Sequence, residues 1–360
     1  MTQRASTLTV AGVLLTILVS VAFLVPVPYV LESPGLTADT LGSDISAAGR
    51  PTDQDVISFG SEVQTYPTEG ELRLTTAQVT RADSKVTLFQ ALGAWFDPED
   101  ALIPRDVVYP PEQSAQEAQD LTRVAMTGSQ ETSEVAGVRA AGYDVEEYVL
   151  VAGVVVDGPS DGVLEPGDRI LAVDGDPVAD SDAVVTAVRS REPGDTIAVT
   201  VLRAGEPRTV DITAEETDDD VDGPRTSIGI TVGPGFDVPV DVTFNLERSI
   251  GGPSAGSMFA LAIYDKLTPG SLTGGEVVAG TGEIDYDGNV GQIGGVAQKL
   301  VSSQEEGATF FLSPAGNCAE ALRAPVDFAQ ITVLRIETLE GAISSLEALA
   351  EDPDASVPTC

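Results

Sequence analysis

The residues whose types and spacing best suit chemistry are Gly252-Pro253-Ser254-Ala255-Gly256. They match the Gly-x-Ser-x-Gly pattern that holds a nucleophilic serine on a sharp turn. A serine in that role needs a base to take its proton, and the usual base is histidine. The chain of 360 residues has no histidine, so a Ser-Asp-His triad is excluded for the isolated chain. A lysine can replace the histidine if its pKa falls from about 10.4 toward neutrality.

The chain offers three lysines as bases, Lys85, Lys266 and Lys299. Lys266 lies at the far end of the helix that Ser254 is expected to open, about 18 Å along the axis. Its interaction with the helix dipole explains it better than a catalytic role does. Lys299 follows the glycine-rich sequence GQIGG (residues 291–295) near the start of another predicted helix. The positive end of that helix lowers the pKa of a lysine, which makes Lys299 the best candidate base.

Two sequences, GGPSAG (251–256) and AGTGEIDYDGNVGQIGGVAQKL (279–300), resemble the proteolytic domain of the Lon proteases. The resemblance covers residues 225–346 and implies an α/β proteolytic domain that hydrolyses peptide bonds. It also implies the roles of the site residues: Ser254 as nucleophile, Lys299 as general base, Thr281 as the hydroxyl that orients the lysine, and Gly252, Pro253 and Ala255 as supporting residues.

The chain departs from many Lon proteases in two respects. Those proteases have an acidic residue directly before GPSAG, where this chain has Gly251. The Gly-x-x-x-x-Gly-Lys-Ser/Thr loop of an ATPase occurs nowhere in the sequence, so we expect no ATP. The resemblance further implies a hexameric ring as a possible homo-oligomer.

Residues 140–214 show strands and turns that resemble a PDZ domain, above all in LEPGDRILAVDGDPV (164–178). PDZ domains bind extended peptides as an added strand in a groove beside a helix. We expect the loop that forms the groove within residues 141–148, although no Gly-Leu-Gly-Phe-type sequence stands there. The groove residues expected in it are Gly142, Tyr143, Val145 and Tyr148. The alternative is a PDZ domain that only packs against its neighbour.

The composition restricts the partners of the chain. Its 57 acidic and 19 basic residues give a net charge of −38, which repels nucleic acid and anionic lipid headgroups. Without histidine and with two cysteines the usual zinc sites cannot form, so we expect no metal and no cofactor. Cys318 and Cys360 could form one disulfide in an oxidising compartment, but a pair of cysteines does not prove it.

The N-terminal segment predicts a membrane anchor. Residues 8–25 carry no charge, and the first acidic residue is Glu32. This length suits a membrane-spanning helix, here assigned to residues 8–31. Arg4 and the amino terminus precede the helix, so the positive-inside tendency places the N-terminus in the cytoplasm and the remaining chain outside the cell membrane. A cleaved signal peptide is the alternative.

Together these patterns predict an α+β multidomain protein with a transmembrane helix, a β-rich PDZ-type domain and a C-terminal Lon-type α/β proteolytic domain. The predicted segments are a cytoplasmic tail (1–7), the anchor (8–31), a linker and N-terminal segment of unknown role (32–134), the PDZ domain (135–215), an acidic linker (216–225), the proteolytic domain (226–350) and a C-terminal tail (351–360). The predicted function is ATP-independent serine endopeptidase, with protein or peptide substrates recruited or gated by the PDZ domain. The alternative is a PDZ peptide-binding scaffold with an inactive Lon-type domain.

Overall fold

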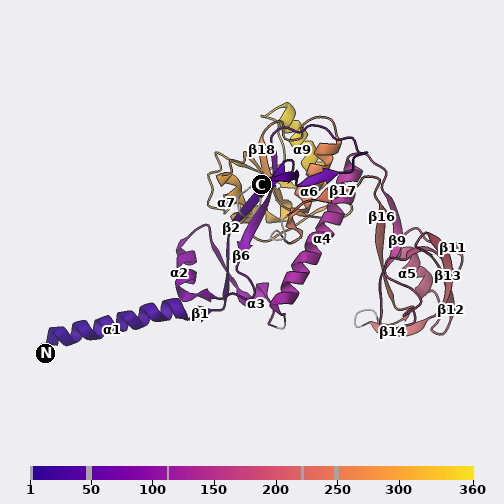
Figure 1. Ribbon diagram of the computed structural model, residues 1–360, viewed down its shortest axis with the longest axis horizontal. Helices are drawn as coiled ribbons and strands as arrows, with labels where there is room; N and C mark the ends of the chain where they lie inside the picture. Colours follow the sequence, from indigo (N-terminus) through magenta and orange to yellow (C-terminus); the bar gives the residue numbers. More distant parts are fainter. Residues whose placement is uncertain (1–2, 46–50, 112, 220–222, 247–250) are drawn as a thin grey trace. The chain divides into compact units, whose positions relative to one another are not determined.

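The computed structural model describes residues 3–45, 51–111, 113–219, 223–246 and 251–360. The chain forms two compact units, labelled in Figure 1 by their helices and strands. Unit 1 comprises Met1–Tyr143 and Val240–Cys360, and unit 2 comprises Asp144–Pro239. Unit 2 is therefore an insertion within the sequence of unit 1.

Unit 1 begins with helix α1 (Gln3–Leu24). Its segment Thr7–Leu24 has a mean hydropathy of 2.4 and no buried residue, and it is long enough to cross a membrane or to act as a signal sequence. The helix ends at Leu24 and not at Leu31, the predicted end of the anchor, because Pro26 and Pro28 remove backbone donors that a continuing helix needs.

A mixed sheet forms the centre of unit 1 (Figure 1). Strands β6, β18, β21 and β22 run parallel, whereas β2 pairs antiparallel with both β6 and β8. In order across the sheet the strands are β22 (Thr332–Ile336), β21 (Phe310–Pro314), β18 (Val277–Gly280), β6 (Glu71–Val79), β2 (Tyr29–Asp39) and β8 (Ala101–Pro104).

Short strand pairs and helices complete the unit. The pairs are β1 (Pro26–Val27) with β7 (Val86–Thr87), β3 (Ser43–Ile45) with β4 (Pro51–Asp55), β5 (Ile57–Phe59) with β17 (Val242–Phe244), and β19 (Glu283–Ile284) with β20 (Val290–Gly291). The helices are α2 (Leu88–Phe96), α3 (Arg105–Val108), α4 (Ala115–Ala140), the 3-10 helix η1 (Pro253–Ala255), α6 (Gly256–Leu267), α7 (Val296–Glu305), the 3-10 helix η2 (Ala315–Asn317), α8 (Cys318–Ala321) and α9 (Leu339–Glu351).

Helices α6 and α7 pack on opposite faces of the sheet. Side chains alternate between the faces of a strand, and Ala279 and Phe311 join Val296 and Leu300 of α7 in one buried cluster. The neighbouring position Gly280 lies on the other face, where a side chain would come within 2.7 Å of Met258 of α6. The nucleophile and base predicted from the sequence therefore approach the sheet from opposite sides.

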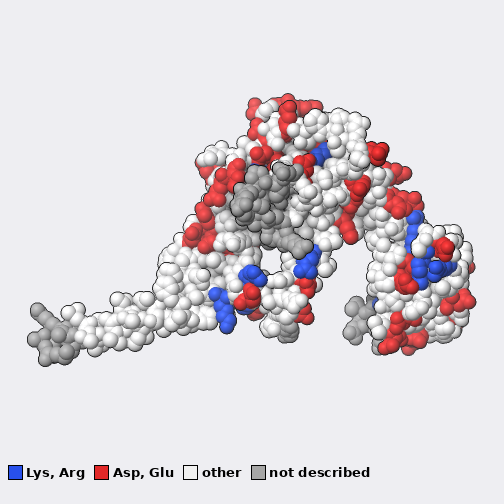
Figure 2. All heavy atoms as spheres, viewed as in Figure 1, with Lys and Arg blue, Asp and Glu red and all other residues white. Residues whose placement is uncertain are grey.

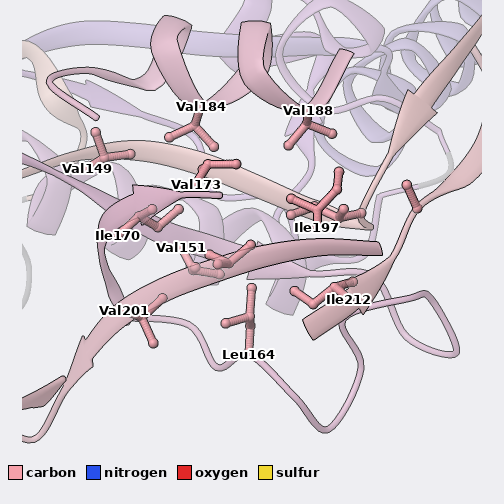
Figure 3. Close-up of a cluster of buried hydrophobic side chains, with 13 residues drawn as sticks. Val149, Val151, Leu164, Ile170, Val173, Val184, Val188, Ile197, Val201 and Ile212 are labelled. Carbon is pink, nitrogen blue, oxygen red and sulfur yellow. The ribbon is translucent and has the colours of Figure 1, made fainter. Parts of the chain in front are cut away.

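Unit 2 is a sheet in the order β13-β12-β10-β9-β16, with the short strand β11 paired to β10. Helix α5 covers this sheet, and Figure 3 shows its Val184 and Val188 directed at a core of valine, isoleucine and leucine side chains. The elements are β9 (Glu146–Val154), β10 (Arg169–Val173), β11 (Asp176–Pro177), α5 (Ser181–Arg189), β12 (Thr196–Arg203), β13 (Glu206–Thr213), the hairpin of β14 (Glu215–Asp219) and β15 (Gly223–Ser227), and β16 (Ile230–Asp237).

The structure corrects the interpretation of residues 32–134 as a linker and separate segment. Strands β2 and β6 lie within the central sheet, where β6 pairs with β18 some two hundred residues away, and α4 packs on α6. Pro34 and Gly35, residue types typical of a loose connection, sit at a bulge, since the register of β2 and β6 shifts between Pro34 and Thr37. This segment is part of unit 1.

Three other predicted boundaries differ from the structure. The acidic run 216–225 is not an open linker, because β14 and β15 pair antiparallel from Glu215 to Ser227. Strand β16 belongs to unit 2, so unit 1 resumes at Val240 and not at residue 226. The C-terminal tail is also held in place: the N–H of Cys360 donates to the carbonyl of Val333 in β22 at 3.0 Å.

Cys318 and Cys360 are joined by a disulfide that links α8 to the end of the chain across 42 residues. We expect the Cys318→Ala/Cys360→Ala variant to lose about 2 to 4 kcal/mol of unfolding free energy, because the unfolded chain regains the entropy of an open loop. Thermal melting followed by circular dichroism measures the change. Reducing the unaltered chain should lower its melting temperature similarly, and a melting temperature insensitive to reductant would contradict the bond.

Candidate active site

The turn that carries Ser254 depends on three small or rigid residues. Gly252 has φ +90°, a conformation that residues with side chains rarely adopt. Pro253 then opens the 3-10 helix Pro253–Ala255, where its fixed φ and missing N–H fit a helix start. At Gly256 a Cβ would come within 2.9 Å of Ser129 and of Ile284. The sequence GPSAG therefore places Ser254 on a tight turn directly before helix α6.

Lys299 and Thr281 contact Ser254 from two other elements. The Lys299 Nζ lies 2.8 Å from Ser254 Oγ and 3.0 Å from Thr281 Oγ1. Thr281 donates its one hydroxyl hydrogen to the carbonyl of Ser254 at 2.9 Å, so its oxygen accepts from the amine. With one N–H held by Thr281, a neutral Lys299 can direct its lone pair at the serine hydroxyl.

These three residues meet at the carboxyl end of strand β18. Thr281 directly follows the strand, and its N–H donates to Leu312 of β21 at 3.2 Å. The N–H of Gly282 donates to the carbonyl of Ser254 at 2.8 Å, which ties the strand end to the serine turn. Because α6 and α7 cover opposite faces, this end of the sheet is where their first turns can approach each other.

Burial decides the protonation of Lys299. The residue is only 3% exposed, and this desolvation disfavours its charged form and lowers its pKa to about 8. The carboxylates of Glu32, Glu283 and Glu320 act in the opposite direction and keep the pKa from falling further. A substantial fraction of the amine is therefore neutral near pH 8.

Glu32 lies against the start of the helix that carries Lys299. It is 8% exposed, and a Cβ on Gly295, the N-cap of α7, would come within 2.4 Å of its Oε1. Burial raises the pKa of Glu32, and the charge of Lys299 lowers it in part. The carboxylate thus shares a buried environment with the amine, a relation that sequence reasoning missed because Glu32 comes from the segment to which the sequence assigned no role.

Helix α4, also from that segment, holds the serine turn. Ser129 Oγ donates to the carbonyl of Pro253 at 3.0 Å, and Ser133 Oγ donates to the carbonyl of Gly256 at 2.9 Å. The N–H of Gly252 donates to the carbonyl of Thr122 at 3.3 Å. The only sequence signal for this role is the spacing of Ser129 and Ser133, four residues apart, which places them on one face if the segment is helical.

The other lysine near the predicted nucleophile is engaged elsewhere. Lys266 stands near the end of α6, as expected, and its Nζ lies 3.2 Å from Asp55 Oδ2 and 3.1 Å from the carbonyl of Ile57. An ion pair and a carbonyl occupy its amine, far from Ser254 along the helix. Lys266 is thus suited to a structural role and not to that of a base.

The residues predicted for the PDZ groove do not form one group in the structure. Gly142 and Tyr143 belong to unit 1, and Val145 and Tyr148 to unit 2. Strand β9, which contains Tyr148, is paired on both sides, with β10 and with β16. It therefore has no edge to which a peptide strand could be added.

The sheet edge next to helix α5 is instead β16. This strand ends the strand order of its sheet, its described pairing is with β9, and it contacts α5. Gly229 precedes it with φ +71°, and the N–H of Val155 donates to the Gly229 carbonyl at 2.9 Å. The signal available in the sequence was Ile228-Gly229-Ile230, an apolar-Gly-apolar stretch. It follows the PDZ-like residues, whereas we expected the groove-forming loop before them, within residues 141–148.

A metal site is not evident in the part of the chain that the structure describes, since no group of three or more His, Cys, Asp or Glu residues there is arranged to hold an ion. The chemistry of the site is that of a hydroxyl and an amine in contact.

Two parts of the chain match known families. Residues 126–214 match the PDZ domain, and residues 249–346 match the C-terminal proteolytic domain of Lon protease (S16). The chain therefore combines a PDZ domain with a Lon-type proteolytic domain.

Individual relatives match only parts of the chain. It is 37% identical to a probable periplasmic serine endoprotease, DegP-like, of Halomonas elongata over 25% of this chain and 19% of that protein. It is 35% identical to the peroxisomal Lon protease homolog 2 of Caenorhabditis elegans over 26% of this chain and 12% of that protein. The PDZ domain of an SdrC-like protein from Listeria monocytogenes is 29% identical over 24% of this chain and 86% of that structure, with a TM-score of 0.22.

We expect replacement of Glu32 by Gln to lower the pKa of Lys299 below about 8, because it removes a negative charge that favours the ammonium form. The chain has three lysines, so NMR of the chain labelled with ¹³C at lysine Cε resolves each titration, and Lys299→Arg assigns the signal. Glu320→Gln is the matched control and should cause a smaller fall, since Glu320 acts more weakly on Lys299. An unchanged Lys299 pKa in the Glu32→Gln chain would contradict the coupling.

Proposed function

We propose that the chain is a membrane-anchored serine endopeptidase that hydrolyses peptide bonds with a Ser254–Lys299 dyad and without ATP. The observation that carries this proposal is the contact of 2.8 Å between Lys299 Nζ and Ser254 Oγ, made by an amine that is almost fully buried. The match of residues 249–346 to a Lon proteolytic domain supports the same reaction class.

The reaction begins when neutral Lys299 accepts the hydroxyl proton of Ser254 as Oγ bonds to the carbonyl carbon of the scissile peptide. The ammonium then gives this proton to the leaving amine, the C–N bond breaks and an acyl-enzyme remains. Water then attacks the carbonyl carbon of the acyl-enzyme and gives a proton to Lys299. The ester bond to Ser254 Oγ breaks, Oγ takes the proton back from the ammonium, and the carboxylic acid product leaves. The N–H groups of Ser254 and Ala255, at the helix start, are suited to stabilise the oxyanion.

Thr281 acts in this scheme by orienting the amine. Its contacts with Lys299 Nζ and with the Ser254 carbonyl connect the base to the backbone of the nucleophile. Because the reactive form of Lys299 is the neutral amine and its pKa is about 8, the rate rises with pH through that value.

The anchor in this proposal is α1, with the N-terminus in the cytoplasm and both units outside the cell membrane. The apolar segment Thr7–Leu24 supports a membrane span, and Arg4 before it supports the orientation. The Cys318–Cys360 disulfide is in keeping with an oxidising exterior. A hexameric ring is proposed from the resemblance to Lon proteases.

The PDZ domain in this proposal receives substrate peptides along strand β16. An extended peptide can add to the free edge of a sheet through backbone hydrogen bonds, with side-chain pockets supplied by the neighbouring helix. The edge position of β16 and its contact with α5 support this location.

The dyad is tested by casein cleavage in detergent with Ser254→Ala, Lys299→Arg and Lys266→Arg chains. We expect the first two to lose at least about 10³-fold in kcat/KM, because one lacks the nucleophile and arginine cannot become a neutral base. Lys266→Arg is the matched control. Arginine keeps the positive charge at this position, so this chain should retain activity. Cleavage that persists in the Ser254→Ala and Lys299→Arg chains would refute the dyad, and casein left intact by every chain would favour the scaffold function.

The PDZ location is tested by hydrogen–deuterium exchange of the Ser254→Ala chain with peptides from digested casein. A peptide bound as an added strand protects backbone amides, so we expect slower exchange within Ile230–Asp237 of β16. Strand β13, at the opposite end of the sheet, is the control edge and should not change. Protection confined to β13, or at neither edge under saturating peptide, would contradict the proposed groove.

A further inference from the structure

Helix α2 exposes its large side chains and buries its small ones. The alanines Ala91 and Ala94 are buried, whereas Trp95 and Phe96 are 77% and 83% exposed. Phe89 and Leu92 are about half exposed on the same helix. A surface helix in water shows the opposite arrangement, with its large apolar residues against the core. The exposed side of α2 is therefore adapted to an apolar environment.

The helix itself is well defined. Thr87 Oγ1 accepts from the N–H of Gln90, and Gln90 Oε1 accepts from the N–H of Thr87, which forms a capping box. The sequence of α2, LFQALGAWF, contains no charged residue. Nine residues without charge and with three aromatic rings are unusual on the surface of a chain with a net charge of −38.

Helix α2 starts where α1 ends. The N–H of Leu88 donates to the carbonyl of Val25, one residue beyond α1, at 3.1 Å. The rings of Phe23 and Phe89 stack with their centroids 4.3 Å apart, and β1 pairs with β7 between the two helices. The depth of α2 relative to a bilayer is therefore set by the end of α1.

Neither the segment Thr7–Leu24 of α1 nor any part of α2 carries a charged residue. In Figure 2 the atoms of α1 beyond its grey end and those of α2 itself are predominantly white, whereas blue basic groups lie near the end of α1 and red carboxylates spread over the sheet and helices of unit 1. Tryptophan next to the end of a spanning helix suits the boundary between lipid tails and headgroups, where it is enriched, and phenylalanine and leucine are typical of the apolar face of an interfacial helix.

We propose that α2 is an interfacial helix that inserts its apolar side, formed by Phe89, Leu92, Trp95 and Phe96, into the membrane leaflet next to the C-terminal end of α1. The inference rests on the proposed membrane anchoring by α1. The occupant of this side is a lipid bilayer, and the acidity of the chain favours zwitterionic over anionic lipid. Two attachments, a spanning helix and an interfacial helix, restrict the tilt of unit 1 at the membrane.

Trp95 is the only tryptophan of the chain and reports its own environment. The full chain is reconstituted into phosphatidylcholine vesicles, and its tryptophan emission is quenched either by phosphatidylcholine brominated near the headgroup end of the acyl chains or by aqueous iodide. We expect a blue-shifted emission that the brominated lipid quenches strongly and iodide quenches little. Vesicle flotation, measured on the same sample, tests the anchor separately.

The Leu92→Asp/Phe96→Asp chain keeps Trp95 but places two charges on the apolar side, so quenching should shift from the brominated lipid to iodide. Leu322→Asp is the matched control, because Leu322 is as exposed as Leu92, at 48%, and lies at the end of α8; it should quench like the unaltered chain. Vesicle-bound protein whose Trp95 is open to iodide would overturn the interfacial helix alone. Trp95 shielded from both quenchers would overturn it in favour of a second copy covering α2, and protein that does not float would overturn both the anchor and this inference.

Discussion

The burial of a single amine, that of Lys299, is the constraint on which the rest of the site depends. Its folded-state pKa of about 8 lies below the ordinary value of 10.5, so the unfolded chain binds more protons between these values and stability rises with pH across that window. Below pH 8 Lys299 is mostly protonated, and the burial of its ammonium group lowers the free energy of unfolding. The sheet, the covering helices and the glycine-rich turn exclude water from Lys299, whose neutral form the proposed dyad requires.

The contacts of the site come from parts of the sequence that lie far apart. Ser254, Thr281 and Lys299 lie in motifs that the sequence reveals, because their residue types and order are specific. Glu32, Ser129 and Ser133 come from strand β2 and helix α4, and nothing in their local sequence indicates that they reach the serine turn or the lysine. Their role follows only from contacts with residues more than a hundred positions away in the sequence.

The same limit applies to the fold. Residues 71–79 of β6 alternate apolar and polar types, which is typical of a strand, but no local pattern could state that this strand pairs with β18. The strands and turns expected in residues 140–214 are present in unit 2. The predicted domain boundaries at residues 215 and 226 were wrong. Strand β16 follows the acidic hairpin and still pairs within the sheet of unit 2, and unit 1 resumes only at Val240. Local signals identify elements, whereas insertion of one unit within another is a property of the long-range contacts.

The most direct test of the central claim is covalent labelling of the folded chain by a serine-directed fluorophosphonate, followed by peptide mass spectrometry across a pH series. If Lys299 is the base, the label appears on Ser254, and its rate of attachment rises through pH of about 8 as the amine loses its proton. The Lys299→Arg chain should remain unlabelled at the same pH values. Labelling of Ser254 at a rate that does not change with pH, or equal labelling of the Lys299→Arg chain, would contradict a Ser254–Lys299 dyad.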